Sequence, residues 1–304
     1  IPMFNICYAD RVGNIYYLYN GTVPKLPHPR NTTQAVPAHR TADIWTDFLT
    51  TAELPQFVNP PGGYVQNCNS PPFFTNLHAP LNPQDFPHYL RENNVSLRSQ
   101  HSLRLIDSEE KLTLEEVCER KHSPLMLLAE RVKPDLIETL RESSPAGQES
   151  AIAALEAWDN TVSAESRVGT LFTEWWRRYE AAGGKFATEW SADQPTATPR
   201  GLADRALARK TFAAALKDLQ GRYERADVTW GEVHRLRKQG TDMPLSGGSG
   251  LMGCFRVLEF RPDEDGRQVA RGGDSYVFAV EFSDPPRAYT VLAYSQSENE
   301  DSPH

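Results

Sequence analysis

Apolar residues at the two ends of the chain follow the pattern of β-strands. Near the amino end, residues 3–9 and 15–19 are rich in β-branched and aromatic residues, and residues 10–14 between them supply turn formers. Two such runs around a short turn predict a hairpin. The second run is apolar on both faces, which is typical of a sheet covered on both sides. Residues 24–61 are broken by prolines and predict no long regular element.

The middle of the chain, residues 108–240, changes to the helical period. Thr113 followed by Glu116 is a capping-box pattern and predicts a helix start. Apolar residues recur at helical spacing over residues 125–140, where Pro134 is expected to break the helix or to start a new one. Three further helices are predicted over residues 148–158, 165–181 and 202–223.

The predicted helix at 165–181 carries an aromatic row: Phe172, Trp175, Trp176 and Tyr179. A Trp-rich row is compatible with a ligand-binding box. Aromatic residues at three- and four-residue spacings are more often core, however, and we interpret this row as core.

Strand-like runs return at residues 254–260, 275–282 and 289–294. Strands on both sides of a long helical block favour the α+β class over alternating strand and helix units, and we expect the end strands to join one sheet sandwich. The sequence therefore predicts three parts: core strands with a proline-rich loop at 1–107, a helical insertion at 108–240, and returning strands at 241–304.

The charge balance and the cysteines limit the classes of partner and site that the chain can have. The chain has 304 residues, 40 acidic against 32 basic residues and a formal net charge of −8, without the basic stripe of a nucleic-acid binder. It contains no apolar run long enough to cross a bilayer, so we expect neither nucleic acid nor membrane as a partner. Cys7, Cys68, Cys118 and Cys254 form no Cys-x-x-Cys pair, which excludes a recognisable zinc or redox motif and leaves disulfides open.

Residues 62–98 hold the strongest candidate chemistry. A glycine pair and a short apolar run at 62–66 predict a strand that brings Asn67 and Asn69 to its end, on the same side of the chain. The Ser-Pro-Pro at 70–72 then stops the strand. Neutral amide donors at a rigid position suit an oxyanion hole. The alternative is a polar turn made by Asn and Pro.

These residues carry a resemblance to a known family. Tyr-Val-Gln-Asn-Cys-Asn-Ser-Pro at 64–71 resembles the strand of the penicillin amidase family that holds the oxyanion-hole asparagine, and Asn69 falls on that position. Residues 96–105 are similar to the family's segment with two arginines six apart. Arg98 matches the first arginine, which helps to hold the nucleophile and the catalytic Asn. The hairpin and the helical block are also similar to family segments.

The resemblance implies part of an αββα sandwich of the amino-terminal-nucleophile hydrolases with an inserted helical lobe. It also implies an acylase that hydrolyses linear amides. Residues 229–236 are most similar to the branch acting on acyl-homoserine lactones and lipopeptides, so fatty-acyl amides are the preferred substrates and aryl-acetyl β-lactams the runner-up. The implied catalytic residues are Asn69 and Arg98, and the substrate-binding candidates are Trp45, Phe57 and Asn67. The two aromatics could equally anchor a loop.

Other expectations concern metals, histidine and compartment. The resemblance implies no cofactor, although some relatives carry a structural calcium ion, for which Asp85 is a loose positional match. His234, followed by arginines, is interpreted as a packing or exposed residue, because the family uses no histidine there. Relatives of this type are often periplasmic, which implies a periplasmic or secreted bacterial protein.

The nucleophile is the missing part of the expected site. The family acts through an amino-terminal Ser, Thr or Cys whose own α-amine is the general base. Ile1 cannot be that nucleophile. We therefore expect an internal fragment of the large subunit, inactive alone and completed by the remaining subunit segments of the same precursor. No Gly-x-Ser-x-Gly elbow supports a Ser-His-Asp hydrolase. A non-catalytic binding or scaffold module with the acylase architecture is the alternative.

Overall fold

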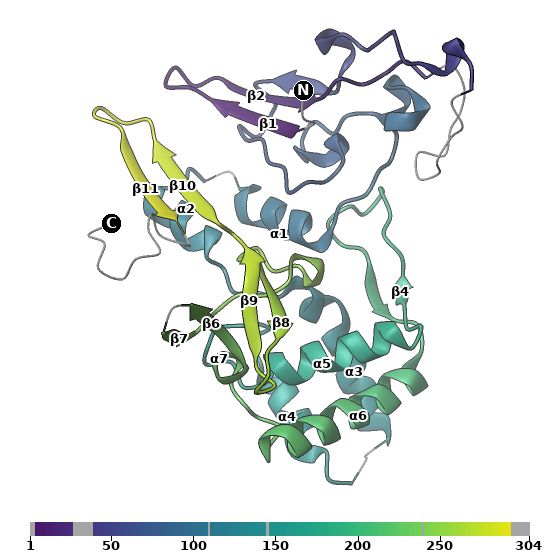
Figure 1. Ribbon diagram of the computed structural model, residues 1–304, viewed down its shortest axis with the longest axis vertical. Coiled ribbons are helices and arrows are strands. Elements are labelled where there is room, and N and C mark those ends of the chain that lie inside the picture. The colour runs from purple at the N-terminus through teal and green to yellow at the C-terminus, as the bar shows by residue number, and fades with distance from the viewer. Residues whose placement is uncertain (1–3, 27–38, 109, 144–145, 239, 293–304) are drawn as a thin grey trace. The chain divides into compact units, whose positions relative to one another are not determined.

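The computed structural model describes residues 4–26, 39–108, 110–143, 146–238 and 240–292. The chain forms two compact units, Ile1–Lys111 and Leu112–His304, whose elements are labelled in Figure 1. Both units mix helices and strands, so the predicted α+β class is confirmed. The three-part division stays a prediction, and residues 293–304 of its third part lie outside the described residues.

A three-stranded antiparallel sheet organises the first unit, in the order β1-β2-β3. Its strands are β1 (Phe4–Ala9), β2 (Ile15–Asn20) and β3 (Gln56–Val58). The predicted hairpin is therefore confirmed. The Asp10 carboxylate fixes its turn by accepting from the backbone N–H groups of Val12 and Asn14, at 3.0 and 2.9 Å. Gly13 follows the required left-handed backbone with φ +93°.

The strand predicted at 62–66 is not formed. Gly62 and Gly63 lie in a turn with φ of +81° and +68°, and residues 62–66 are assigned to no strand, although Gln66 N–H donates to Thr75 O at 3.2 Å. A strand needs a neighbour along its whole edge. Here the chain instead enters an irregular loop that leads to helix α1 (Leu97–Ile106), which begins at the N-cap Ser96.

Helices dominate the second unit. Helix α2 begins at the predicted capping box, where Thr113 Oγ1 accepts from Glu116 N–H and the Glu116 carboxylate accepts from Thr113 N–H. The helices are α2 (Leu114–Lys121), α3 (Leu127–Ser143), α4 (Glu149–Ala157), α5 (Gly169–Ala181), α6 (Arg205–Tyr223) and α7 (Trp230–Val233).

The expected helix break at Pro134 is wrong, because α3 continues through it. Proline in a helix interior costs about 3 kcal/mol. Val132, Leu136 and Leu140 around it are fully buried, and each such side chain contributes about 2 kcal/mol by burial, which outweighs the cost. Two other helices start later than predicted. Helix α5 starts at Gly169, and α6 starts at Arg205, after the N-cap Asp204.

The aromatic row of α5 is core, as predicted. Phe172, Trp175, Trp176 and Tyr179 are at most 3% exposed. Trp175 donates its indole N–H to the carbonyl of Ala208 at 3.2 Å, which ties α5 to α6, its neighbour in Figure 1. Helix α6 also carries fully buried apolar residues, Ala208, Phe212 and Leu219, and packs against α5.

The strands of the second unit form three sheets. The first sheet pairs β4 (Phe186–Thr188) with β5 (Arg200–Leu202). The second has four strands in the order β7 (Thr241–Pro244), β6 (His234–Lys238), β9 (Gln268–Gly273) and β8 (Leu258–Pro262). The third pairs β10 (Tyr276–Glu281) with β11 (Arg287–Leu292). Within the described residues, strands from the two ends of the chain lie in different sheets. The charged strand β6 was not predicted, because ion pairs of Arg235 and Arg237 with Asp242 replace apolar alternation.

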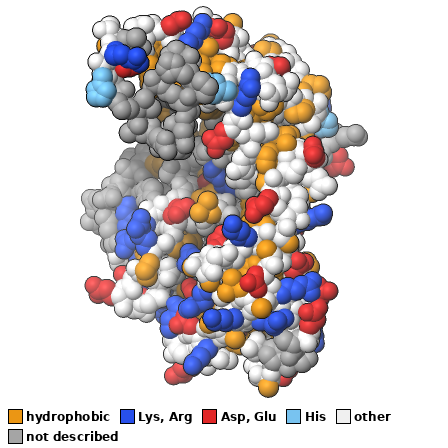
Figure 2. All heavy atoms as spheres, turned by 90° about the vertical axis from the view of Figure 1, so that its right-hand side faces the viewer, with side chains coloured by type: hydrophobic (Ala, Val, Ile, Leu, Met, Phe, Trp, Pro, Cys, Tyr) orange, Lys and Arg blue, Asp and Glu red, His pale blue; other side chains and the backbone are white. Residues whose placement is uncertain are grey.

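Several features of the surface bear on the sequence predictions. Figure 2 shows basic and acidic side chains intermixed over one face, in agreement with ion pairs such as Arg205 with Glu138 and Glu142. None of the helices in the described ranges is both long and apolar enough for a membrane span. The four cysteines all lie in the described residues, and none of them forms a disulfide.

His234 makes the stability of the second unit depend on pH. Its ring is 3% exposed, stacks on Trp230 at 3.5 Å between centroids, and Nδ1–H donates to the Trp230 carbonyl at 3.1 Å. Burial, with a smaller effect of Arg177, lowers the pKa of His234 from 6.5 to about 3. The unfolded chain therefore binds a proton below pH 6.5 that the folded chain excludes, and stability falls as the pH drops toward 3.

We expect lowering the pH from 7.5 to 5.0 to cost about 2 kcal/mol through His234 alone. In His234→Phe this part of the pH dependence should disappear. Urea unfolding followed by tryptophan fluorescence at both pH values tests this, because other titrating groups cancel between the two proteins. An equal pH dependence in both would contradict the assignment.

Candidate functional site

The loop 67–70 uses its two asparagines differently. Asn67 Oδ1 accepts from Asn69 N–H at 2.7 Å, and Asn67 Nδ2 donates to the Ser70 carbonyl at 2.9 Å. Both polar groups of the Asn67 carboxamide are thus engaged in shaping the loop. Asn69 takes a left-handed conformation, φ +65°, which Asn tolerates better than most residues. Its side chain is exposed and lines a pocket.

Arg98 fixes the orientation of the Asn69 carboxamide. Its Nη2 donates to Asn69 Oδ1 at 2.7 Å and to the Cys68 carbonyl at 2.6 Å. A guanidinium can only donate, so the atom that faces it is the carboxamide oxygen. The Asn69 NH2 group is therefore left to act as a donor. The structure thus brings together the two residues predicted to be catalytic, whose roles stay predictions.

Helix α1 holds Arg98 and the loop 67–70 in position. Ser96 Oγ caps the helix by accepting from Ser99 N–H at 3.3 Å, which places Arg98 in the first turn. The buried Ser99 hydroxyl also contacts the Ser70 hydroxyl at 2.5 Å. The loop is consequently attached to α1 at two points. The sequence gave no signal for the Ser70–Ser99 contact, because serines 29 residues apart carry no local pattern.

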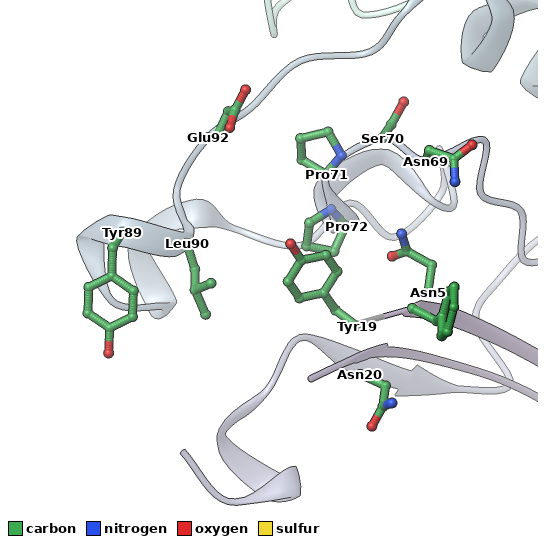
Figure 3. Close-up of a pocket in the computed structure, with 11 residues that line it drawn as sticks. Asn5, Tyr19, Asn20, Asn69, Ser70, Pro71, Pro72, Tyr89, Leu90 and Glu92 are labelled. Atoms are coloured by element: carbon green, nitrogen blue, oxygen red, sulfur yellow. The ribbon is translucent and has the colours of Figure 1, made fainter. Parts of the chain in front are cut away.

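A pocket of about 380 Å³ adjoins the loop (Figure 3). It is bounded by the ends of β1 and β2, by the loop and its two prolines, and by residues 89–92. The lining residues are Phe4, Asn5, Tyr19, Asn20, Asn69, Ser70, Pro71, Pro72, Tyr89, Leu90 and Glu92. Burial, together with the charge of Glu92, raises the pKa of Tyr19, so its phenol stays neutral at ordinary pH. The wall combines rings with neutral amides.

Asn5 is a pocket residue that the sequence analysis missed. It lies on β1, where a carboxamide within a β-rich run was the only available signal. The hydroxyl of the fully buried Tyr17 donates to Asn5 Oδ1. In Figure 3 the nitrogen of Asn5 points toward the loop that carries Asn69 and Pro72.

The other predicted residues lie elsewhere. Trp45 is 54% exposed in a loop and is not among the pocket lining. Phe57, on β3, is also outside the lining and packs against Tyr17 with ring centroids 5.4 Å apart. His234 is a buried packing residue in the second unit. The assignments of Trp45, Phe57 and Asn67 to substrate binding stay predictions.

Asp85 is the residue that the resemblance matches loosely to a structural calcium site. It is exposed on a short 3₁₀ turn, and its Oδ1 accepts from Asn82 Nδ2 at 3.3 Å. Among the described residues no group of three or more His, Cys, Asp or Glu side chains is placed to hold a metal ion. Calcium prefers six to eight oxygen ligands, so Asp85 and Asn82 alone would not complete its coordination, and the calcium expectation stays a prediction.

Comparison with known proteins gives relatives for the whole chain. Acyl-homoserine lactone acylase PvdQ of Pseudomonas fluorescens is 25% identical over 336 residues, covering 100% of this chain and 42% of that protein. The protein of that name from Pseudomonas putida is 25% identical over 329 residues, with the same coverage of 100% and 42%. The chain thus spans less than half the length of these curated relatives.

Structural comparison agrees with this relationship. A thermostable penicillin G acylase from Alcaligenes faecalis shares the fold, with a TM-score of 0.55 and 17% identity over 100% of this chain and 61% of that one. The penicillin amidase family model matches residues 1–304. The chain therefore belongs to the penicillin amidase family.

Proposed function

We propose that this chain provides the oxyanion-binding part of an acylase that hydrolyses N-acyl amides. The observation that carries the proposal is the Asn69 carboxamide, which lines a pocket with its oxygen held by Arg98. Family membership and relatives named as acylases support it. A polar turn alone would not require a guanidinium directed at one particular side-chain oxygen.

The geometry suits stabilisation of a tetrahedral intermediate. Attack on the scissile carbonyl converts its oxygen to an oxyanion, which a fixed N–H donor stabilises more strongly than it stabilises the ground state. Because Arg98 already holds the oxygen of the Asn69 carboxamide, the NH2 group needs no reorientation during the reaction. The arginine charge lies behind the donor and further polarises the amide.

The remaining parts of the reaction belong to other segments in this proposal. The chain matches 42% of the length of the relatives, which supports completion of the site by further segments of a longer precursor. Those segments would supply an amino-terminal nucleophile and its α-amine base. Attack by the nucleophile forms an acyl-enzyme and releases the amine, and water then releases the acid.

Acyl-homoserine lactones are the proposed substrates, since the curated relatives are named for them. Aryl-acetyl β-lactams are the second candidate, because the structural neighbour is a penicillin G acylase. A scaffold module without chemistry is the competing class. Hydrolysis of N-octanoyl homoserine lactone by the full-length protein, followed by mass spectrometry of released octanoate, separates these possibilities.

Replacing Asn69 with Ala in the full-length enzyme should lower kcat by roughly a hundredfold to a thousandfold, or about 3 to 4 kcal/mol of barrier. KM should change little, because the ground-state carbonyl gains less from the donor than the oxyanion does. Steady-state kinetics on a fatty-acyl amide measures both constants. Asn94→Ala, an exposed asparagine just before α1, is the matched control. A near wild-type kcat in Asn69→Ala would refute the oxyanion assignment.

Arg98→Lys should keep the charge but lose the fixed guanidinium geometry. We expect kcat to fall roughly tenfold or more, given about 1.5 to 3 kcal/mol for a hydrogen bond to a charged group, while the thermal midpoint changes little. The double variant with Asn69→Ala decides how Arg98 acts. If Arg98 works through Asn69, the double variant loses no more activity than Asn69→Ala alone. Additive losses would show a separate role.

A further inference from the structure

Asn5 and Asn69 present their carboxamides to the pocket in the same way. In each, a neighbouring donor holds the oxygen: Arg98 for Asn69, and the Tyr17 hydroxyl for Asn5. The Tyr17 hydroxyl donates to Asn5 Oδ1, and burial raises the pKa of Tyr17, so this hydroxyl keeps the proton that it donates. The Asn5 NH2 group is therefore directed away from Tyr17, toward the loop of Asn69 in Figure 3.

The support behind Asn5 is rigid. Asn5 is paired with Tyr19 across the hairpin, and Cys7 with Tyr17, so Asn5 and Tyr17 lie on the same face of the sheet. Tyr17 is fully buried against Phe57 of β3, with ring centroids 5.4 Å apart. The pairing of the two strands and the contact between the two rings thus fix where the Asn5 carboxamide lies.

No protein acceptor for the Asn5 NH2 group is found in the described part of the chain, although the side chain lines the pocket. A fixed donor facing a pocket without a protein partner is suited to an acceptor atom of a ligand. The surrounding wall is polar for its size, since Asn20, Ser70 and Glu92 also line it. It fits the polar end of an N-acyl amide better than a long acyl chain.

Resting on the proposed acylase function, we propose that Asn5 is a substrate-binding residue that donates a hydrogen bond to an oxygen in the amine part of the substrate. The ring carbonyl of a lactone is such an acceptor. Asn69 donates to the oxygen of the scissile carbonyl, and Asn5 donates to an oxygen of the amine leaving group beside it. The two amides together recognise two oxygens of one molecule.

Two substrates of matched shape test this in the full-length protein. N-octanoyl homoserine lactone offers ring oxygens, and N-octanoyl cyclopentylamine offers none. We expect the wild-type KM to be about three- to tenfold lower for the lactone, the range of one neutral hydrogen bond. In Asn5→Ala this preference should vanish, with kcat close to wild type and the KM of the cyclopentyl amide unchanged.

Two further variants separate binding from a structural role. Asn5→Asp keeps the acceptor for the Tyr17 hydroxyl but has no donor, so it should also lose the lactone preference. If Asn5 served only to hold Tyr17, Asn5→Asp would keep the preference and the proposal would fall. Tyr17→Phe should weaken the preference by releasing the Asn5 carboxamide.

Tyr16→Phe is the matched control for Tyr17→Phe. The Tyr16 hydroxyl donates to the carboxamide of Gln56 at 2.8 Å, the same kind of bond, but Tyr16 and Gln56 lie outside the pocket lining. Its lactone preference should equal that of the wild type. Equal effects of the two Tyr variants would overturn the proposal, as would a kcat loss in Asn5→Ala as large as that in Asn69→Ala with both substrates.

Binding calorimetry in the Asn69→Ala background distinguishes failure of this inference from failure of the proposed function. If the lactone binds with a lower Kd than the cyclopentyl amide and Asn5→Ala removes this difference, the Asn5 assignment is supported. This holds even if the wild type releases no octanoate, a result that would refute only the proposed acylase activity. If the wild type hydrolyses the lactone and Asn5→Ala keeps the same lactone preference, only the Asn5 assignment is refuted. No binding of either compound refutes both.

Discussion

The contact of Arg98 with Asn69 is the constraint on which the candidate site depends. Asn69 is an exposed residue on an irregular loop, where a free carboxamide would rotate and offer oxygen and nitrogen equally. Two bonds from one guanidinium nitrogen, to the Cys68 carbonyl and to Asn69 Oδ1, remove that freedom. Arg98 is itself placed by the first turn of α1, which the Ser96 cap begins. Local helix chemistry thereby determines which atom of an amide 29 residues away faces the pocket.

The hairpin of β1 and β2 also fixes the orientation of a carboxamide, that of Asn5, but through a different donor. Here the donor is the neutral hydroxyl of Tyr17 rather than a guanidinium, and burial raises the pKa of Tyr17, so the hydroxyl keeps its proton. The apolar strand pattern that favours a covered sheet is thus also what orients Asn5. Packing and the orientation of the pocket donor depend on the same residue, because loss of the Tyr17–Phe57 ring contact would also release the Asn5 carboxamide that faces the pocket.

The sequence predicted what depends on neighbours in the chain. The capping box at Thr113 and Glu116, the hairpin turn around Asp10 and the core row of α5 each follow from local rules, and all three are present. The continuation of α3 through Pro134 was not predictable, because it depends on burial against other elements. The positions of Asn69 and Arg98 were accessible from motif resemblance. The roles of Tyr17 and Ser99 were not, because each acts through a contact with no sequence pattern.

The failed strand prediction at 62–66 explains the site better than its success would have. In a strand, Asn67 and Asn69 would point to one side and be chemically equivalent. The left-handed backbone at Asn69 separates them, so Asn67 uses both its polar groups to shape the loop. That loop turns the Asn69 oxygen to Arg98 and leaves its nitrogen for the pocket. The irregular backbone is therefore the feature that makes one of two identical residues available for chemistry.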